Sequence, residues 1–135
     1  MECLFCKIVS GGIPCFKIYE DENVLAFLDI HPVNPGHTLV IPKKHYQDFL
    51  EIPEQEVGRI ISVIKKIIPA VLAGVEAKGF NLNLNNGREA GQTIDHVHWH
   101  IVPRIENDGR SLWSGKDYNE GEAQQVMDSI NGYLT

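Results

Sequence analysis

The fold is decided by the segment Asp95-His96-Val97-His98-Trp99-His100-Ile101-Val102-Pro103-Arg104, in which three histidines alternate with large apolar residues. Side chains two residues apart lie on the same face of a β-strand. We therefore expect a strand over Ile94–Val102, with the histidines on one face and Val97, Trp99 and Ile101 packed into a core on the other. Three adjacent imidazoles are poor core material, because each buried ring nitrogen needs a partner. The histidine face is accordingly the first candidate for chemistry.

Upstream segments predict further strands. Phe80–Asn85 alternates apolar residues with asparagine, which is the period of a strand with one buried face. Apolar stretches predict shorter strands over Lys17–Tyr19, Val24–Ile30 and Thr38–Ile41. Between the last two, His31–Gly36 contains two prolines and a glycine, so we expect a loop there.

A long amphipathic helix is predicted from Pro53 to Gly79. Apolar residues recur there at helical spacing: Val57, Ile60, Ile61, Ile64, Ile68, Val71, Leu72 and Val75. Pro69 lies inside this pattern and is expected to kink the helix or interrupt its hydrogen bonds. A second, shorter helix is expected over Ala123–Leu134. Strands and helices do not alternate regularly, which favours an α+β fold with an antiparallel sheet.

Composition sets the class of protein. The length of 135 residues predicts a single domain over residues 1–135, in which residues 104–135 form a C-terminal extension packed on the body. The formal net charge of −6 argues against a nucleic acid partner. No apolar run approaches the ~20 residues of a membrane span, so no membrane partner is expected. Three cysteines, an odd number, suit a reducing compartment, and we expect a cytoplasmic protein.

The histidine face suggests two chemistries. Three histidines can hold a metal ion, or one imidazole can attack an electrophile while a neighbour manages protons. Their spacing does not decide between these. The preceding loop, Asn85–Thr93, offers glycines for close backbone approach together with side-chain donors. Such a loop can hold an anion through backbone N–H groups.

The pair Cys3-Leu4-Phe5-Cys6 is a second candidate for chemistry. A Cys-x-x-Cys pair can bind zinc or act as a redox dithiol, but by itself it is half of a metal site. A redox role requires a helix start and a thioredoxin-like pattern, and the sequence shows neither. Cys15 has no partner by this count and is expected to be a simple small residue.

The sequence resembles the histidine triad (HIT) family of nucleotide hydrolases and transferases. The stretch His96-Val97-His98-Trp99-His100-Ile101-Val102 matches the family signature, in which histidines alternate with apolar residues and two apolar residues follow. Other stretches are similar to characteristic family stretches, in the family's order: Leu4–Ile8, Leu25–Ile30, Gly36–His45 and Ala90–Thr93. The resemblance covers most of the chain and implies a HIT-like fold.

The resemblance implies three catalytic residues. His98 would attack the α-phosphorus of a nucleotide and form a nucleotidyl-histidine intermediate, which water or another acceptor resolves. His100 would lie beside the phosphate and assist with charge or protons, and His37 would complete the cluster from a neighbouring strand. The other ring nitrogen of His98 would donate to the backbone carbonyl of His96, which fixes the tautomer.

The resemblance also assigns residues to the substrate, a purine nucleotide. Asp29 would accept both ribose hydroxyls. Without the resemblance, a turn or capping role would be favoured for this residue. An apolar slot for the purine would be formed by Phe5, Ile8, Phe27 and Ile30, for which ordinary core packing is the alternative. Phosphate contacts would come from Asn85, Gly91, Gln92 and Thr93. A divalent cation would accompany a polyphosphate substrate.

Some family members bind structural zinc with a Cys-x-x-Cys pair and two histidines. The matching residues here are Cys3, Cys6, His45 and His96. This is a closed Cys2His2 set with no place for substrate. We therefore expect structural Zn²⁺, with buried free thiols as the alternative. If His96 binds zinc, His98 and His100 carry the chemistry.

The resemblance further implies a homodimer. The long helix and the Phe80–Asn85 strand are plausible interface elements, because joining two sheets across a dimer removes exposed edges. Purine phosphoramidases and dinucleoside polyphosphate hydrolases share the triad. The extension after Arg104 is closer to the dinucleotide branch. Three alternatives stay open: a nucleotide-binding or scaffolding module with little turnover, a metal-dependent hydrolase using the three histidines, and a dinucleoside polyphosphate phosphorylase.

Overall fold

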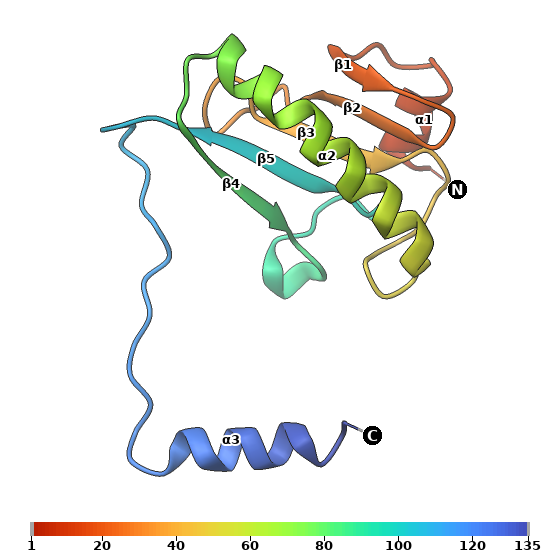
Figure 1. Cartoon of the computed structure of the whole chain (residues 1–135). Coiled ribbons are helices and arrows are strands. Elements are labelled where there is room, and N and C mark those ends of the chain that lie inside the picture. Colours follow the sequence, from red (N-terminus) through yellow and green to blue (C-terminus); the bar gives the residue numbers. More distant parts are fainter. Residues whose placement is uncertain (1, 135) are drawn as a thin grey trace.

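The chain folds around a five-stranded antiparallel sheet, which the computed structural model describes with its helices over residues 2–134. The strand order is β1-β2-β3-β5-β4 (Figure 1), which confirms the expected α+β class. In chain order the elements are α1 (Leu4–Val9), β1 (Lys17–Glu20), β2 (Val24–Leu28), β3 (Thr38–Pro42), α2 (Glu54–Gly74), β4 (Gly79–Leu84), the 3₁₀ turn η1 (Arg88–Ala90), β5 (Trp99–Arg104) and α3 (Glu122–Asn131).

Strands β2 and β3 form the centre of the fold because helices cover both of their faces. Alternate residues of a strand point to opposite faces. Val24 and Ala26 pack in the larger core with α2, whereas Leu25 and Phe27 pack with α1 around Phe5. This two-sided burial explains why both strands are continuous apolar runs in the sequence.

Helix α2 ends at Gly74, earlier than the predicted end at Gly79. The N–H of Ala77 donates to the Leu72 carbonyl over 2.9 Å, and Glu76 between them has a φ of 57°. This is the hydrogen bonding of a Schellman cap, in which a left-handed residue follows the last turn. The prediction placed the end too late because that left-handed position is held by glutamate, and a glycine is the usual signal for it.

One stripe of α2 lies on the sheet, and it includes Ile60, Ile64 and Val71 of the predicted residues. Ile61 is exposed, so its predicted place in the stripe was wrong. The helix residues that are buried are Ile60, Val63, Ile64, Ile67 and Val71. Helix α2 continues through Pro69, and the predicted interruption of its hydrogen bonds is the single donor that proline lacks. Proline removes one backbone donor from the ladder, and packing of the stripe on the sheet holds the helix together on either side.

Strand β5 begins at Trp99, so the predicted start at Ile94 was wrong. Its pairing with β3 extends only as far as Val40. Beyond that point β3 reaches Pro42, which has no N–H to donate. The Pro42 carbonyl instead accepts a hydrogen bond from Nε2 of the His96 ring, over 2.8 Å. A side chain therefore replaces the backbone pairing in front of β5.

The two sides of the histidine segment nevertheless separate as expected. Val97, Trp99 and Ile101 lie in the core beneath α2. His98 and His100 lie beside one another on the opposite side, with ring centroids 5.0 Å apart. The apolar half of the alternation thus anchors the segment and presents these two imidazoles away from the core.

Strand β4 is an edge strand whose apolar residues are only partly covered. Leu84 packs against the core, but Phe80 and Leu82 are 41% and 42% exposed. The prediction of one buried face therefore holds at the end of the strand alone, because α2 does not extend over the rest. An apolar, unpaired edge of this kind is a site for association.

The C-terminal extension leaves the body after Arg110 and carries α3 away from the sheet (Figure 1). Helix α3 buries none of its residues, and Trp113 is 89% exposed. Residues of Arg104–Arg110 bond to the body, and Ser111, Leu112 and Trp113 line a shallow cavity together with β4. Among residues 2–134, no hydrogen bond ties residues 111–134 to the body, so nothing holds the apolar stripe of α3 against it. None of the described helices has the length and apolar character that crossing a membrane requires.

Candidate functional site

A cavity of about 390 Å³ lies between α1, the end of β2 and the start of β5. Its lining contains eight of the predicted site residues: Phe5, Ile8, Phe27, Asp29, Ile30, Thr93, His98 and His100. The rings of Phe5 and Phe27 meet edge to face with their centroids 5.6 Å apart. An apolar pocket with a few polar groups at one end is suited to a flat ligand that carries a polar substituent.

His98 is held with one ring nitrogen free. Its Nδ1 lies 2.7 Å from the backbone oxygen of His96, and since a carbonyl can only accept, Nδ1 carries the hydrogen. In the neutral ring Nε2 then keeps its lone pair. Phe5 packs its ring edge to face against His98 at 5.0 Å, which fixes the imidazole plane. This is the preparation that an imidazole nucleophile requires.

His37 and His100 form a chain of hydrogen bonds with one direction. The backbone N–H of Val33 donates to His37 Nδ1 over 3.0 Å, so the hydrogen of the neutral His37 ring is on Nε2. Nε2 lies 2.9 Å from His100 Nδ1 and donates to it. His100 therefore carries its own hydrogen on Nε2. That atom is buried and has no partner among residues 2–134.

Burial keeps these rings neutral. It lowers the pKa of His100 to about 4, with the neighbouring His98 and His37 adding to the effect. It also lowers the pKa of His98 and of His37, and nearby Asp29 partly offsets the shift in each. At neutral pH the cavity therefore contains one Nε2 lone pair, on His98, and one Nε2–H donor, on His100.

Asp29 makes the turn contact that its sequence favoured and also lines the cavity. Its Oδ1 accepts the backbone N–H of His31 over 2.8 Å, which is a turn contact. Its Oδ2 lies 3.7 Å from His37 Nε2, and the residue lines the cavity. One carboxylate oxygen is thus used by the loop, and the other is directed toward the histidines.

The predicted phosphate-binding residues of the loop before the histidines differ in where their side chains lie. Thr93 lines the cavity, and a Cβ on Gly91 would lie 3.6 Å from Nδ2 of Asn85. Gln92 is buried, and its side chain bonds to backbone groups of the loop: it accepts from Gly87 and donates to Gln47 and Ile94. These bonds give Gln92 the task of holding the loop in shape.

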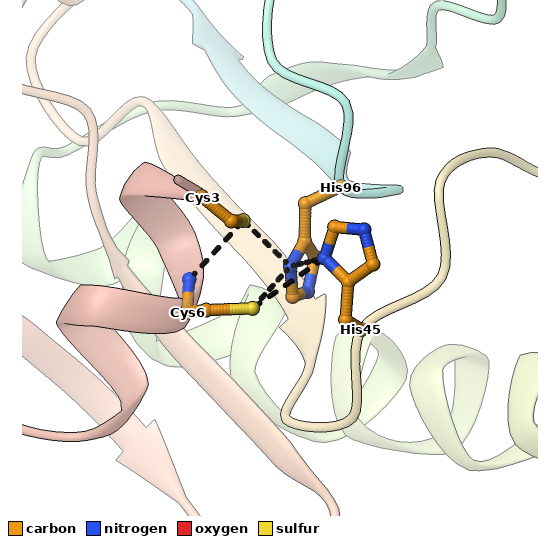
Figure 2. Close-up of side chains that lie close together, drawn as sticks. All are labelled: Cys3, Cys6, His45 and His96. Carbon is orange, nitrogen blue, oxygen red and sulfur yellow. Dashed lines mark hydrogen bonds between the residues drawn. The ribbon is translucent and has the colours of Figure 1, made fainter. Parts of the chain in front are cut away.

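A second group of side chains lies at the other end of the histidine segment (Figure 2). One ligand atom from each of four residues lies within 4.8 Å of the others: Cys3, Cys6, His45 and His96. The two Nδ1 atoms are 3.3 Å apart, and three sulfur–nitrogen distances are 3.4, 3.4 and 3.6 Å. Tetrahedral zinc at ordinary bond lengths separates two nitrogens by about 3.3 Å and nitrogen from sulfur by about 3.5 Å. The donor set fits zinc.

Protonation within this group also suits a cation. His96 donates from Nε2 to the Pro42 carbonyl, so its Nδ1 lone pair faces the sulfur atoms. Burial lowers the pKa of His96 to about 4, which keeps that nitrogen available. Burial, followed by the hydrogen bond and charge of Cys3, raises the pKa of the Cys6 thiol to about 11. A bound divalent cation reverses that shift and makes the thiol a thiolate ligand.

The amino-terminal segment contains features that the sequence did not reveal. Helix α1 begins at Leu4, with Cys3 at its N-cap, so the expectation that no helix starts at the cysteine pair was wrong. Both thiols face imidazoles, an arrangement of metal ligands. Cys15, expected to be a bystander, lines the cavity with Ile13 and Pro14. No local pattern marks these last three residues, because the turn at Gly11–Gly12 brings them to the cavity.

The three histidines of the segment do not converge on one point. His96 faces the thiols, whereas His98 and His100 line the cavity. A further group brings ligand atoms of Asp29, His37 and His100 within 4.8 Å, but the two histidine nitrogens there already share a hydrogen bond. This geometry does not favour a catalytic metal held by the three histidines.

Comparison with known proteins finds relatives along most of the chain, and a family model matches it as well. A family model described as "HIT domain" matches residues 10–107. An uncharacterised HIT-like protein of Methanocaldococcus jannaschii is 49% identical over 130 residues, 96% of this chain and 99% of that protein. The adenylylsulfatase HINT3 of Arabidopsis thaliana is 39% identical over 139 residues, 98% and 70% of the two chains. The adenosine 5′-monophosphoramidase hnt1 of Schizosaccharomyces pombe is 47% identical over 104 residues, 77% and 75%.

Solved structures agree over the whole length. A HIT family protein from Bacillus subtilis superposes with a TM-score of 0.88 at 42% identity, covering 100% of this chain and 99% of that one. A zinc-bound histidine triad family protein from Mycobacterium smegmatis superposes with a TM-score of 0.78 at 40% identity, covering 98% and 97%. The coverage extends into the C-terminal extension, so that segment is shared with these proteins.

Proposed function

The chain belongs to the HIT family, and we propose that it is a nucleotide hydrolase that cleaves the bond from the α-phosphorus of a purine nucleotide to its leaving group. The substrates would be purine nucleotide phosphoramidates or dinucleoside polyphosphates, and the product AMP or GMP. The names of two relatives, an adenylylsulfatase and an AMP phosphoramidase, support nucleotide hydrolysis at the level of the family.

One observation carries the proposal: two neighbouring Nε2 atoms are prepared for opposite tasks. The hydrogen bond to the His96 carbonyl leaves Nε2 of His98 with a lone pair. The chain from Val33 through His37 leaves Nε2 of His100 with a hydrogen. A nucleophile beside a hydrogen-bond donor is what transfer of a phosphorus centre requires.

The reaction follows in two steps. His98 Nε2 attacks the α-phosphorus, a P–N bond forms, and the bond to the leaving group breaks; the leaving group takes up one proton. The His96 carbonyl stabilises the positive charge that the His98 ring acquires, while His100 Nε2–H donates to a phosphate oxygen or the leaving group. Water then attacks phosphorus, the P–N bond breaks, and the proton released by water balances the first. Neutral His98 and the nucleoside monophosphate result.

Substrate binding is proposed to follow the lining of the cavity. The purine would lie between the apolar side chains of Phe5, Ile8, Phe27 and Ile30. Asp29 would accept the ribose hydroxyls with the oxygen that faces the histidines. Thr93, Asn85 and the backbone at Gly91 would contact the phosphate, and Gln92 would act by holding this loop. With a polyphosphate, a divalent cation would accompany the substrate and neutralise the outer phosphates.

We also propose that Cys3, Cys6, His45 and His96 hold structural Zn²⁺. The fit of the donor distances and of the His96 tautomer supports this. The ion would tie α1 and the segment around His45 to the front of the histidine segment. It would supply stability and no chemistry, because its four ligands leave no open position.

A homodimer is the assembly we propose. The exposed Phe80 and Leu82 lie on the free edge of β4, where pairing with a second copy would extend the sheet. The uncovered stripe of α3 is a further apolar surface that association could bury. A light-scattering mass near that of one chain would contradict this.

The free thiols of the three cysteines support the proposal of a cytoplasmic location.

The test is turnover of two compounds by two proteins. Wild type and His98→Ala are each incubated with adenosine 5′-phosphoramidate, and with a diadenosine polyphosphate plus Mg²⁺, and products are separated by chromatography. We expect wild type to release AMP and the variant to release none. AMP binding by the variant, measured by calorimetry, controls for an intact cavity. ADP formed in place of AMP, and only when phosphate is added, would instead indicate a phosphorylase.

A protein that binds AMP without turning over either compound would support a nucleotide-binding module. The roles of His98 and His100 would then be withdrawn. The preferred compound, if there is turnover, decides between the phosphoramidase and dinucleotide branches.

A further inference from the structure

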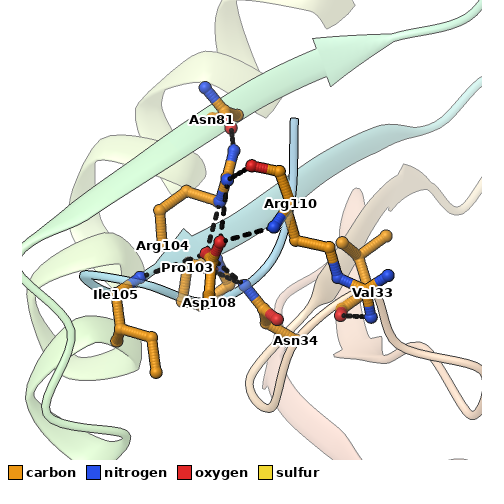
Figure 3. Close-up of polar contacts among 8 residues, drawn as sticks. All are labelled: Val33, Asn34, Asn81, Pro103, Arg104, Ile105, Asp108 and Arg110. Atoms are coloured by element: carbon orange, nitrogen blue, oxygen red, sulfur yellow. Dashed lines mark hydrogen bonds and ion pairs between the residues drawn. The ribbon is translucent and has the colours of Figure 1, made fainter. Parts of the chain in front are cut away.

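The turn that follows β5 is tied to the loop that precedes His37 (Figure 3). Its centre is the Asp108 carboxylate, whose side chain is only 5% exposed. The carboxylate accepts from Arg104 Nε over 2.7 Å and Nη2 over 3.0 Å, a bidentate pair. It also accepts from Asn34 Nδ2 over 2.9 Å and from the backbone N–H of Arg110 over 2.9 Å. These bonds lower the pKa of Asp108 and keep it ionised.

Two contacts run from this turn into the His31–Gly36 loop. Asn34, held by Asp108, donates also to the Pro103 carbonyl over 3.0 Å. Nη2 of Arg110 donates to the Val33 carbonyl over 2.6 Å. The loop has no strand partner at these residues, so these bonds hold its backbone together with the Asp29 contact to the N–H of His31 and the two bonds to His37.

The same loop residues hold His37 from the other side. The Asn34 carbonyl accepts the backbone N–H of His37 over 3.1 Å, and the Val33 N–H donates to His37 Nδ1 over 3.0 Å. The Val33 bond decides the tautomer of His37, and through His37 that of His100. Asp108 and Arg110 thus act on the cavity through Val33 and Asn34, without lining it.

Reversal of this chain has a defined chemical consequence. If the Val33 N–H turned away, the His37 hydrogen could reside on Nδ1. His37 Nε2 would then be an acceptor, and His100 would bond to it by donating from Nδ1. The Nε2 of His100 would lose its hydrogen, and the cavity would contain two lone pairs in place of one lone pair and one donor.

We propose that Asp108 and Arg110 are positioning residues that keep the Val33 N–H on His37 and thereby keep the donor hydrogen of His100 directed into the cavity. The catalytic consequence rests on the proposed hydrolase function, whereas the tautomers are a property of the protein alone. Through Asp108 and Arg110 the turn after β5 positions the histidines of the cavity and is not only the root of the extension.

The test uses Arg110→Ala in the full chain, because Arg110 is exposed and its loss leaves the partly buried Asp108–Arg104 pair in place. Ring-¹⁵N histidine NMR reads which nitrogen of His37 and of His100 carries the hydrogen. Wild type should show Nε2–H for both, and the variant should show a measurable Nδ1–H fraction. With the phosphoramidate, kcat should fall about tenfold, the effect of one lost hydrogen bond, while KM stays within about twofold.

Two matched variants complete the test. Arg110→Lys retains a donor for the Val33 carbonyl and should restore the tautomers and most of kcat. Glu106→Ala changes an exposed residue of the same turn and should behave as wild type. Unchanged tautomers and kcat in Arg110→Ala would overturn the proposal, as would Nδ1–H at His100 in wild type. If wild type shows the expected tautomers but hydrolyses neither compound, the positioning stands and the proposed function fails.

Discussion

His96 and His98 lie two residues apart on one segment, yet their backbone partners prepare them for different work. His96 donates from Nε2 to the Pro42 carbonyl and directs its Nδ1 lone pair at two thiols. His98 donates from Nδ1 to the His96 carbonyl and directs its Nε2 lone pair into the cavity. The same residue type is thus suited to ligate a metal or to attack an electrophile according to which ring nitrogen a carbonyl occupies.

The comparison implies that the two ends of the segment can be separated by mutation. One end, called here the metal end, is the proposed zinc group of Cys3, Cys6, His45 and His96. It joins α1 to the sheet and should control stability. The other end, called here the cavity end, is His98 and His100, which line the cavity. These residues do not connect α1 to the sheet and should control turnover. A mutation at one end should therefore change either turnover or stability and leave the other quantity close to that of wild type.

The largest effect is expected from His98→Ala. Loss of the proposed nucleophile should lower kcat for the phosphoramidate by about 10³-fold or more, since the neighbouring His100 presents an Nε2–H and no imidazole lone pair in its place. The metal end should be unchanged, so zinc content by atomic absorption should stay at the wild-type ratio. A variant that lost activity and zinc together would mean that the two ends are one unit.

The next largest is expected from the double variant Cys3→Ala/Cys6→Ala. Loss of two ligands should abolish zinc binding and lower Tm by about 10 °C or more. In the fraction that stays folded, kcat for the phosphoramidate should remain within a few-fold of wild type, because His98 and His100 keep their partners. Differential scanning calorimetry and active-site-normalised rates measure the two quantities.

Cys15→Ala is the matched control, since it removes a thiol without touching the metal group. It should keep zinc and Tm. If activity of metal-free wild type instead returned in proportion to added zinc, the ion would be part of the chemistry and the separation would be wrong.

Regular periodicity made most of the fold predictable. The β2 and β3 runs are apolar because both faces are covered, and the stripe of α2 follows from helical spacing. Helix α1 was missed because a six-residue helix has too few turns to show a period. The end of α2 was misplaced because glutamate, not glycine, takes the left-handed position at Glu76.

The residue types of the site were predictable, and so was the hydrogen of His98, which the family resemblance placed on the nitrogen that faces the His96 carbonyl. The hydrogens of His37, His96 and His100 were not predictable. The signature and its neighbours identify the histidines, Asp29 and the cysteine pair. Which nitrogen of each ring carries the hydrogen depends on the carbonyls of Pro42 and His96 and on the N–H of Val33. The Val33 N–H and the His96 carbonyl lie in irregular backbone, and Pro42 is the last residue of β3, so no side-chain pattern encodes which ring nitrogen these groups meet. Gln92 illustrates the same point, because its amide is used inside the loop.

A smaller effect is expected from Asp29→Asn, which tests whether Asp29 binds the ribose of the substrate. Asp29→Asn keeps the turn contact to His31 but weakens the acceptor for the ribose. We expect KM for the phosphoramidate to rise about tenfold, the worth of one hydrogen bond to a charged group, with a smaller change in kcat. The 2′,3′-dideoxy analogue of the substrate should lose the same factor with wild type and little with the variant. Equal losses with both proteins would place the ribose elsewhere.

The smallest effect concerns acid stability and tests whether the cavity end is held neutral. An unfolded histidine titrates near 6.5, whereas burial lowers the pKa of His100 to about 4. Between these values the unfolded chain binds a proton that the folded chain does not, so acidification must favour unfolding. The free energy of unfolding should fall as pH drops from 6.5 to 4, with a slope from this residue of at most about 1.4 kcal/mol per pH unit.

His100→Asn removes that contribution and should flatten the pH dependence of urea unfolding over the same interval. Because acid also protonates metal ligands, both proteins are compared after a chelator has removed the metal, which leaves the metal end identical in the two. The difference between the two slopes then belongs to the cavity end alone. Equal slopes would mean that His100 takes up its proton in the folded protein near the ordinary pH, and the neutral Nε2–H donor on which the comparison rests would be lost below that pH.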